Sequence, residues 1–346
     1  MRKLLLIPLI LLALVIPVSA SDFTPPKVPE SAGAIMPKDP VNLQEGIRYI
    51  LKQTIAAVRP DLAEAYRICS SLVLVTILVS VSGAFPGVTG RTGRLVGVIT
   101  VSTIVLSPAG ALINLAVNVI TQISSYGKLL LPVMTGALAA QGGVTSSAAL
   151  YAGTAAFNAI LSYVITGILV PLVYCFLALA AVNAVTGLDT VKRIRDLMKG
   201  VTVWTLKTSL YVFTGYMGIT GVVSGSTDAA ALKATKLTIS SVVPVVGGIL
   251  SDASEAVLVS AGTLKNAAGL YGMLALLAIW AGPFAKIGIH YLLLRLSGMI
   301  CSIFGQKEIT ELIQDLAGGM GILLAMTGAV CLMFLISVFC FMRGVV

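Results

Sequence analysis

The sequence predicts an all-α polytopic membrane protein made of tandem helical repeats, with Pro- and Gly-broken helices and two re-entrant hairpins. Of the 346 residues, 57% are hydrophobic and only 11% are charged, whereas a soluble domain carries roughly 25% charged residues. Long apolar runs recur along nearly the whole chain, as expected for helices that cross a bilayer. A Gly- and Pro-rich signature that occurs twice predicts the repeat and the breaks.

The duplicated signature reads P-V-x-x-G-x-L, then A-G-T, then N-A, beginning at Pro132 and again at Pro244. A second match, I-x-D-L-x-x-G, occurs at Ile194–Gly200 and Ile313–Gly319. This match lies in charged segments, where chance agreement is less common than among apolar residues. Each copy contains two full crossings, an even number, so the copies would be parallel and related by an axis along the membrane normal.

Residues 1–20 have the pattern of a cleavable signal peptide. Arg2 and Lys3 precede a short apolar core, and Val18–Ala20 fits the small-x-small cleavage rule. An uncleaved anchor is the alternative. Residues 21–67 are predicted to be an extracytoplasmic linker and amphipathic helix, in which a Pro-rich lead precedes a helical 3–4 spacing. That helix would lie on the membrane surface, meet a partner or pack beside the spans.

Residues 68–125 form a predicted N-terminal transmembrane pair. The first span is Ile68–Phe85, and Arg91 and Arg94 place the following loop inside by the positive-inside rule. The second span, Leu95–Ile123, is predicted to break into two half-helices around Pro108.

The first membrane repeat covers residues 126–223. Within Gly127–Asn158 the sequence Q-G-G predicts a re-entrant helix–turn–helix hairpin, since backbone freed at membrane depth must be sheltered by protein or line water. An inward crossing kinked at Pro171, a charged inside loop at 189–200 and an outward crossing over 201–223 complete the repeat.

The second membrane repeat covers residues 237–342 and follows the same course. Its hairpin is Leu237–Ala268, and an inward crossing broken at Pro283 comes next. An inside loop over 301–315 and an outward crossing over Gly319–Met342 end the repeat. This second inside loop is acidic, which weakens the charge argument there.

Two polar groups in the second hairpin are candidate functional residues. Asp252 and Glu255 are spaced i, i+3, and ionisable groups at membrane depth usually face a water-filled path or a partner. They would line a polar passage or pair with Lys265; alternatively, both are solvated at the outer surface. Asn158 and Asn266 follow A-G-T in the two copies, and such amides cap helix ends or form hydrogen bonds across helices.

Lys286 and His290 share one face of the last inward crossing at i, i+4. One interpretation is a proton or anion relay within the membrane. The other is that these side chains reach toward the cytoplasmic interface near the end of the helix.

Several classes of function are not supported by the sequence. No phosphate-binding loop, H-E-x-x-H motif or pair of intramembrane aspartates occurs, and one His cannot supply a multi-histidine metal cluster. The five Cys residues form no C-x-x-C pair and suit packing. The net charge of +9 comes from short loops between apolar runs, so it indicates membrane orientation, with no nucleic-acid partner. We expect no enzyme activity, no cofactor and no metal.

The second repeat resembles the stage III sporulation protein AE family of spore-forming Firmicutes. The likeness lies in Pro244–Ala267, Gly269, the run Pro283–Ile287 and the closing I-Q-D-L, and the signal peptide and multi-span body fit as well. The resemblance implies a membrane subunit of the stage III sporulation A complex in the mother-cell membrane around the forespore. In that complex, sibling membrane subunits and a separate ATPase act with a forespore partner to form a channel between the cells. The Pro-rich lead is short for the family, which leaves any role of that region open.

The function expected from these observations is that of a multi-pass, non-enzymatic subunit of a sporulation channel or secretion-like complex, in a structural or path-lining role. Its partners would be the sibling subunits, the ATPase indirectly, and the lipid bilayer. The residues expected to line a path or contact a partner are Pro244, Gly247, Gly248, Asp252, Glu255, Gly262, Asn266, Lys286 and His290. The alternative is a stand-alone secondary transporter built on two parallel repeats.

Overall fold

The computed structural model describes residues 26–37, 42–82, 89–242, 247–304 and 306–343, with side chains for all of these except 31, 89–91 and 221–257. The described residues form helices joined by short turns and include no strand. In chain order the helices are α2 (Glu30–Gly33), α3 (Leu43–Ala57), α4 (Arg59–Ser82), α5 (Thr89–Ala140), α6 (Val144–Val164), the π-helix η2 (Ile165–Leu169), α7 (Val170–Thr186), α8 (Asp189–Val242), α9 (Gly247–Ser302) and α10 (Lys307–Arg343).

Five helical stretches are long and apolar enough to cross a membrane. Their most apolar windows have mean hydropathies from 1.6 to 2.6. They are Arg59–Ser82, Thr92–Ala140, Val144–Thr186, Leu258–Ser302 and Lys307–Arg343. The predicted polytopic helical membrane protein is therefore confirmed at this level. Within the described residues α8 is not among the five, so an outward crossing over 201–223 stays a prediction.

Several helices are much longer than a bilayer requires. Helices α5, α8 and α9 contain 52, 54 and 56 residues, which corresponds to about 80 Å each at 1.5 Å per residue. A hydrocarbon core of about 30 Å is crossed by about 20 helical residues, and ordinary tilts add only a few more. A large part of each long helix must therefore lie outside the hydrocarbon layer.

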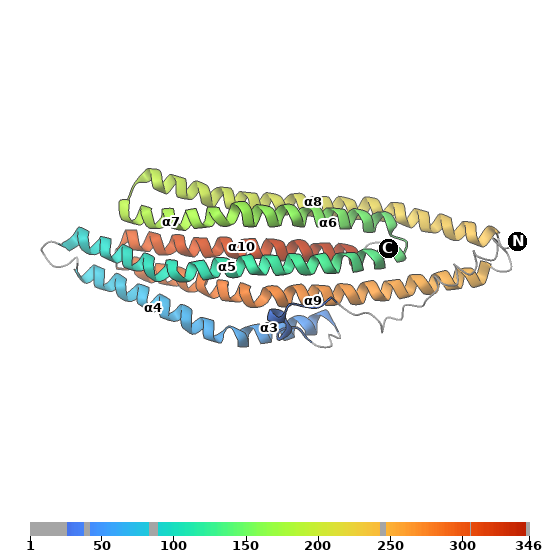
Figure 1. Cartoon of the computed structure of the whole chain (residues 1–346), viewed down its shortest axis with the longest axis horizontal. Helices are drawn as coiled ribbons and strands as arrows, with labels where there is room; N and C mark the ends of the chain where they lie inside the picture. The colour runs from blue at the N-terminus through green and yellow to red at the C-terminus, as the bar shows by residue number, and fades with distance from the viewer. Residues whose placement is uncertain (1–25, 38–41, 83–88, 243–246, 305, 344–346) are drawn as a thin grey trace.

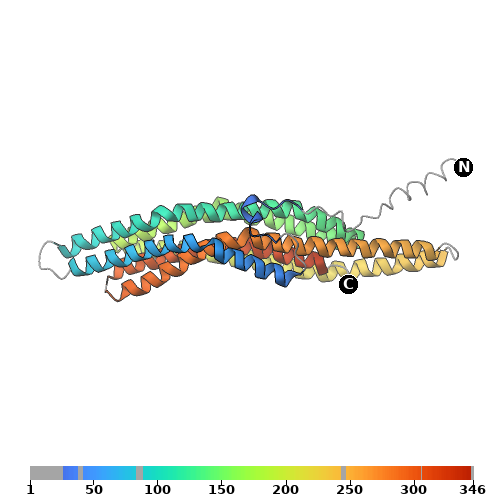
Figure 2. The same ribbon diagram turned by 90° about the horizontal axis from the view of Figure 1, so that it is seen from below.

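The helices form an elongated bundle with three tiers, in which α6–α7 and α8 lie above, α5 and α10 in the middle, and α3, α4 and α9 below (Figures 1 and 2). Helix α10 is central and packs against α5, α6, α7, α8 and α9. Of its apolar window 61% is buried, compared with 22% for α4, which packs against α5 and α9. The core is thus assembled around the last helix of the chain.

One end of the bundle collects the ends of six helices. Ser80 in α4 donates a hydrogen bond to the carbonyl of Phe304, which follows α9, at 3.2 Å. Arg94 near the start of α5 pairs with Glu308 at the start of α10 at 3.3 Å, and the turn between α7 and α8 lies at the same end (Figure 1). The three segments that the positive-inside rule assigns to the inside, around Arg94, at 189–200 and at 301–315, therefore lie at the same end of the bundle.

The first hairpin has the predicted turn but not the predicted short arms. Gly142 has a φ of 92°, a conformation that favours Gly, and the Gly143 N–H donates to the Leu138 carbonyl at 3.0 Å. Helix α5 nevertheless continues through Pro108 and Pro132, so the expected break into half-helices at Pro108 is wrong. Neighbouring helices can shelter the carbonyls that an internal Pro leaves unpaired.

The other expected breaks have mixed outcomes. Pro171 follows the π-helical turn η2, where the Val170 N–H donates to the Ile165 carbonyl, so the irregularity expected there is found as a wide turn. Helix α9 passes through Pro283 without ending, so the break predicted there is wrong. The charged inside loops at 189–200 and 301–315 are also mostly helical, because α8 begins at Asp189 and α10 at Lys307.

The amphipathic segment within 41–67 forms two helices. Helix α3 ends at Ala57 and α4 begins at Arg59, beside Pro60, where a Pro at the start of a helix is tolerated. Gly46, Ile50 and Thr54 are the buried face of α3, and this face packs against α9. Of the alternatives for this helix, packing beside the spans is the one found.

The internal repeat and the re-entrant hairpins are not confirmed. Pro132 lies inside α5, ten residues before the Gly142 turn, whereas Pro244 lies in 243–246, outside the described residues between α8 and α9. The two I-x-D-L-x-x-G segments each begin in the second turn of a helix, α8 in one case and α10 in the other.

Candidate functional site

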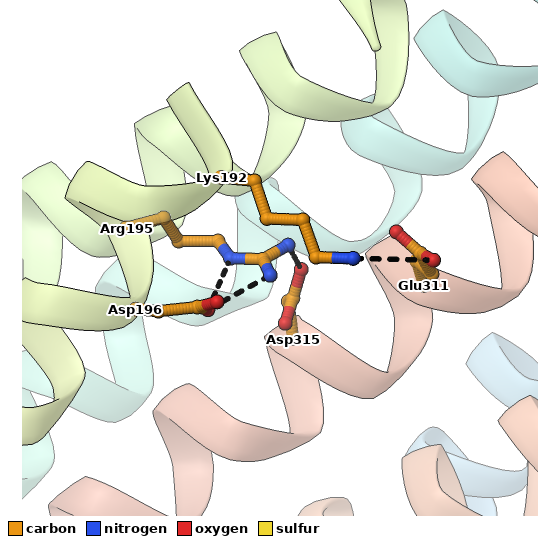
Figure 3. Close-up of polar contacts among 5 residues, drawn as sticks. All are labelled: Lys192, Arg195, Asp196, Glu311 and Asp315. Atoms are coloured by element: carbon orange, nitrogen blue, oxygen red, sulfur yellow. Dashed lines mark hydrogen bonds and ion pairs between the residues drawn. The ribbon is translucent and has the colours of Figure 1, made fainter. Parts of the chain in front are cut away.

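The candidate site is a cluster of ion pairs that joins these two I-x-D-L-x-x-G segments (Figure 3). Arg195 of α8 is 5% exposed. Its Nε and Nη2 donate to Oδ1 of Asp196 at 3.0 and 2.8 Å, and its Nη1 donates to Oδ2 of Asp315 on α10. The third residues of the two motifs, Asp196 and Asp315, thus both bind the Arg195 guanidinium. Its planar group of N–H donors suits two carboxylates.

A second pair, Lys192 with Glu311, bridges the same helices at 3.8 Å. Lys199 also lies over the Gly318 backbone, where a Cβ would come within 3.3 Å of the ammonium. Three cations and three carboxylates therefore balance, which reduces the cost of burying them between α8 and α10. This arrangement fixes the register of the two helices.

The Lys286–His290 face is bound to a residue that the sequence did not connect with it. Lys286 Nζ lies 2.6 Å from Oδ1 of Asp61 on α4. His290 is buried, and its Nδ1 lies 3.0 Å from the Lys286 carbonyl, so Nδ1 is the donor in this hydrogen bond. A void of about 10 Å³ between α4, α5, α9 and α10 lies beside His290, which is space for one water at most.

The polar residues after A-G-T differ between the copies. Asn158 is buried and accepts a hydrogen bond from Ser124 of α5 at 3.0 Å, which confirms the predicted bond across helices. Thr154 donates to Ser337 of α10 at 3.0 Å, one turn away. Asn266 is exposed on α9, and its side chain makes no hydrogen bond to a described residue, so the bond across helices stays a prediction there.

The remaining predicted residues lie along the first part of α9 or before it. Pro244 is outside the described residues, and for Gly247, Gly248, Asp252 and Glu255 the structure describes the helical backbone but not the side chains. Glu255 and Lys265 are about 15 Å apart along this helix, far beyond the spacing at which side chains meet. The spacing along α9 does not favour a pairing of Lys265 with Asp252 or Glu255, which stays a prediction because those two side chains lie outside the described ones.

Gly262 is the member of this set with a defined close contact. A Cβ at Gly262 would overlap the side-chain amide of Gln141 in the α5–α6 turn. Gly269, one of the residues behind the family resemblance, is likewise close to Met342 near the end of α10. The first part of α9, with the end of α8, continues past both of these elements (Figure 1). The structure therefore separates Lys286 and His290, inside the bundle, from Asp252 and Glu255, on a projecting two-helix arm.

Sequence reasoning missed Arg195, Asp315 and Asp61 as interacting residues. The I-x-D-L-x-x-G match did indicate the two motifs that contain Asp196 and Asp315. It was the sequence signal from which the ion-pair cluster could have been found. Nothing comparable pointed to Asp61, because its partner is more than two hundred residues away in the chain. Among the described residues, no group of three His, Cys, Asp or Glu side chains is arranged to hold a metal.

The apolar spans, the central buried helix and the charge-balanced helix pairing define a polytopic helical membrane protein. The family model described as stage III sporulation protein AE matches residues 35–343, so the chain belongs to that family. It is also 25% identical over 225 residues to the stage III sporulation protein AE of Bacillus subtilis (strain 168). That match covers 65% of this chain and 56% of the relative, so the chain spans little more than half the length of the curated relative it matches. No solved structure matches this chain.

Proposed function

We propose that this protein is a multi-pass, non-enzymatic subunit of the sporulation channel complex between mother cell and forespore, located in the mother-cell membrane. Membership of the stage III sporulation protein AE family supports this proposal most directly. Its partners would be sibling membrane subunits and, indirectly, a separate ATPase. The chain would act as a scaffold, since its ion pairs join α8 to α10 and α4 to α9.

The lengths of α8 and α9 support a role that extends beyond the bilayer. These helices, of 54 and 56 residues, continue past the end of α10 and past the α5–α6 turn (Figure 1). The arm carries Gly247, Gly248, Asp252 and Glu255 on α9. We therefore assign the arm to partner contact outside the hydrocarbon layer, where carboxylates are tolerated without a buried counter-ion.

The test is deletion of the gene in its sporulating host, with complementation by the full chain. Loss of a late forespore-specific reporter, restored by the wild-type chain, is the expected result. A second strain carrying Asp252→Asn and Glu255→Gln together should insert normally but restore the reporter less well. If the deletion strain shows a normal reporter, the proposed function is wrong.

The rival, a stand-alone secondary transporter, is favoured only by the Asp61–Lys286 pair within candidate spans. Such carriers bind their solute near the bilayer midplane between broken helices. Here the void beside His290 is about 10 Å³, and α9 is unbroken at Pro283. Uptake of a solute by the purified chain alone in liposomes would support the rival instead.

A further inference from the structure

The outer face of α5 is polar where a membrane span is expected to be apolar. Between Thr100 and Lys128, α5 exposes no large apolar side chain. The exposed positions, spaced three or four residues apart, form one stripe along the helix. We call this the α5 stripe: Ser107, Ala111, Asn114, Asn118, Thr121 and Ser125.

The α5 stripe lies level with the most apolar part of the bundle. A Cβ on Gly97 of α5 would meet Ile309 of α10, and one on Gly127 would meet Phe334. Between these two contacts α5 runs alongside α10, whose mean hydropathy of 2.6 is the highest of the five candidate spans. The stripe is therefore at membrane depth and not in a segment beyond the bilayer.

A lipid-facing helix of the same chain has a different surface. Helix α4, the least buried candidate span, exposes Leu62, Tyr66, Leu74, Leu78 and Val81. Large apolar side chains of this kind suit contact with acyl chains. The contrast indicates that α5 is not covered by lipid in the assembled protein.

The chemistry of the stripe requires hydrogen-bonding neighbours. The Thr121 hydroxyl donates to the Val117 carbonyl in its own helix. The side-chain amides of Asn114 and Asn118 make no hydrogen bond to the residues that the structure describes. An amide in hydrocarbon without a partner costs several kcal/mol on the scale of transfer to a solvent that cannot form hydrogen bonds. Two such amides one turn apart are therefore expected to have partners beyond the described part of this chain.

Exposed alanines recur along the neighbouring face of α6, beside the exposed side chains of Tyr151, Ile160 and Tyr163. Ala148, Ala152, Ala156 and Ala159 are exposed at helical spacing on α6, which is held against α5 by the Ser124–Asn158 hydrogen bond. Small residues at a membrane-helix surface allow another helix to approach closely, and Asn, Ser and Thr form hydrogen bonds across such contacts. A water-filled path would account for the amides but would not require the alanines.

We propose that the α5 stripe and the alanine face of α6 together dock a transmembrane helix of another subunit. The docked helix carries small residues at its contact face and at least one hydrogen-bonding side chain opposite Asn114 and Asn118. This proposal rests on the proposed function, because it names the surface by which the chain joins its membrane assembly.

The experiment places a photo-crosslinking residue at Asn118 in the full chain, in sporulating cells that also carry tagged sibling membrane subunits. The matched control has the same residue at Leu78, on the apolar face of α4. The Asn118 position should crosslink to a sibling subunit and the Leu78 position should not. Equal crosslinking at both positions, or none at Asn118, would overturn the proposal.

A second measurement uses Asn114→Leu with Asn118→Leu, which removes both amides from an exposed face without disturbing the packed core. Co-purification of the crosslinked sibling should fall about fivefold to tenfold, the loss expected from two interhelical hydrogen bonds. Leu74→Ala with Leu78→Ala should leave this co-purification unchanged.

Rapid labelling of Asn118→Cys by a charged maleimide in the intact assembly would show a water path and overturn the helix-docking proposal. If the gene deletion blocks sporulation while the double Leu variant sporulates and assembles normally, the surface is wrong and the proposed function stands.

Discussion

Two ion-pair sites that join helices, the Arg195 cluster and the Lys286–Asp61 pair, differ in how completely they are enclosed. The Arg195 side chain is 6% exposed and contacts two carboxylates. The Lys286 side chain is 35% exposed and contacts one, Asp61, whose side chain is 20% exposed. A buried charge without its partner is strongly destabilising, whereas a partly exposed charge can be hydrated. The Arg195 cluster therefore holds its helices in a fixed register, while the Lys286–Asp61 pair can separate at a modest cost in free energy.

The helices that each site joins reinforce this difference. Arg195 links α8 to α10, the central helix of the bundle, whereas Asp61 links α4, at the periphery, to α9. Loss of the first site would disturb packing throughout the bundle. Loss of the second would release one outer helix while the rest stays assembled.

The largest expected effect comes from Arg195→Met, which leaves Asp315 buried without its guanidinium. We expect the free energy of unfolding to fall by about 3–5 kcal/mol, measured by SDS titration of the purified full chain in mixed micelles. Arg193→Met is the matched control, because Arg193 lies two residues away on α8 but is exposed. A loss for Arg195→Met no larger than that of the control would show that the cluster does not hold the bundle together.

Combining Arg195→Met with Asp315→Leu tests whether the loss reflects an unpaired charge. The double variant removes both charges from the α8–α10 interface, so it should be more stable than Arg195→Met alone. A coupling energy of about 1–3 kcal/mol is expected from the double-mutant cycle in the same titration. Additive losses would instead mean that each side chain contributes through packing alone.

Local signals in the sequence predicted the features that depend on local chemistry. Q-G-G predicted the turn at Gly142, where the φ of 92° needs Gly, and Pro171 marked a π-helical turn. Pro108 and Pro283 gave false breaks, because tertiary packing lets the helices continue through them.

The candidate site could be predicted only in part, for a related reason. The I-x-D-L-x-x-G match singled out both motifs, but the sequence did not show that Arg195 of one binds Asp315 of the other. Asp61 was assigned to an amphipathic helix outside the spans, and its pairing with Lys286 depends on how α4 folds back along α9. Contacts between distant segments follow from helix packing, which no short pattern encodes.

Lys286→Met should have a smaller and more local effect than Arg195→Met. Because Asp61 is partly exposed, we expect a loss of about 1 kcal/mol, confined to the contact between α4 and α9. Cys69, buried on α4, reports this opening, and its maleimide labelling rate should rise about fivefold. Labelling of Cys331, buried on the central helix α10, is the internal control and should not change. Faster labelling of both thiols would mean that this pair, like the Arg195 cluster, supports the whole bundle.

The smallest expected effect is at the exposed pair between Arg94 and Glu308, whose side chains are 50% and 40% exposed. Arg94→Ala should reduce the free energy of unfolding by about 0–1 kcal/mol, and salt should screen what little is lost. The measurement repeats the SDS titration at low and high salt with Arg94→Ala and Arg195→Met side by side. If exposure explains the difference between these sites, added salt should abolish the loss of unfolding free energy caused by Arg94→Ala. Most of the loss caused by Arg195→Met should remain at high salt. An Arg94→Ala loss that is large and independent of salt would show that charge at this end of the bundle matters even when it is not enclosed.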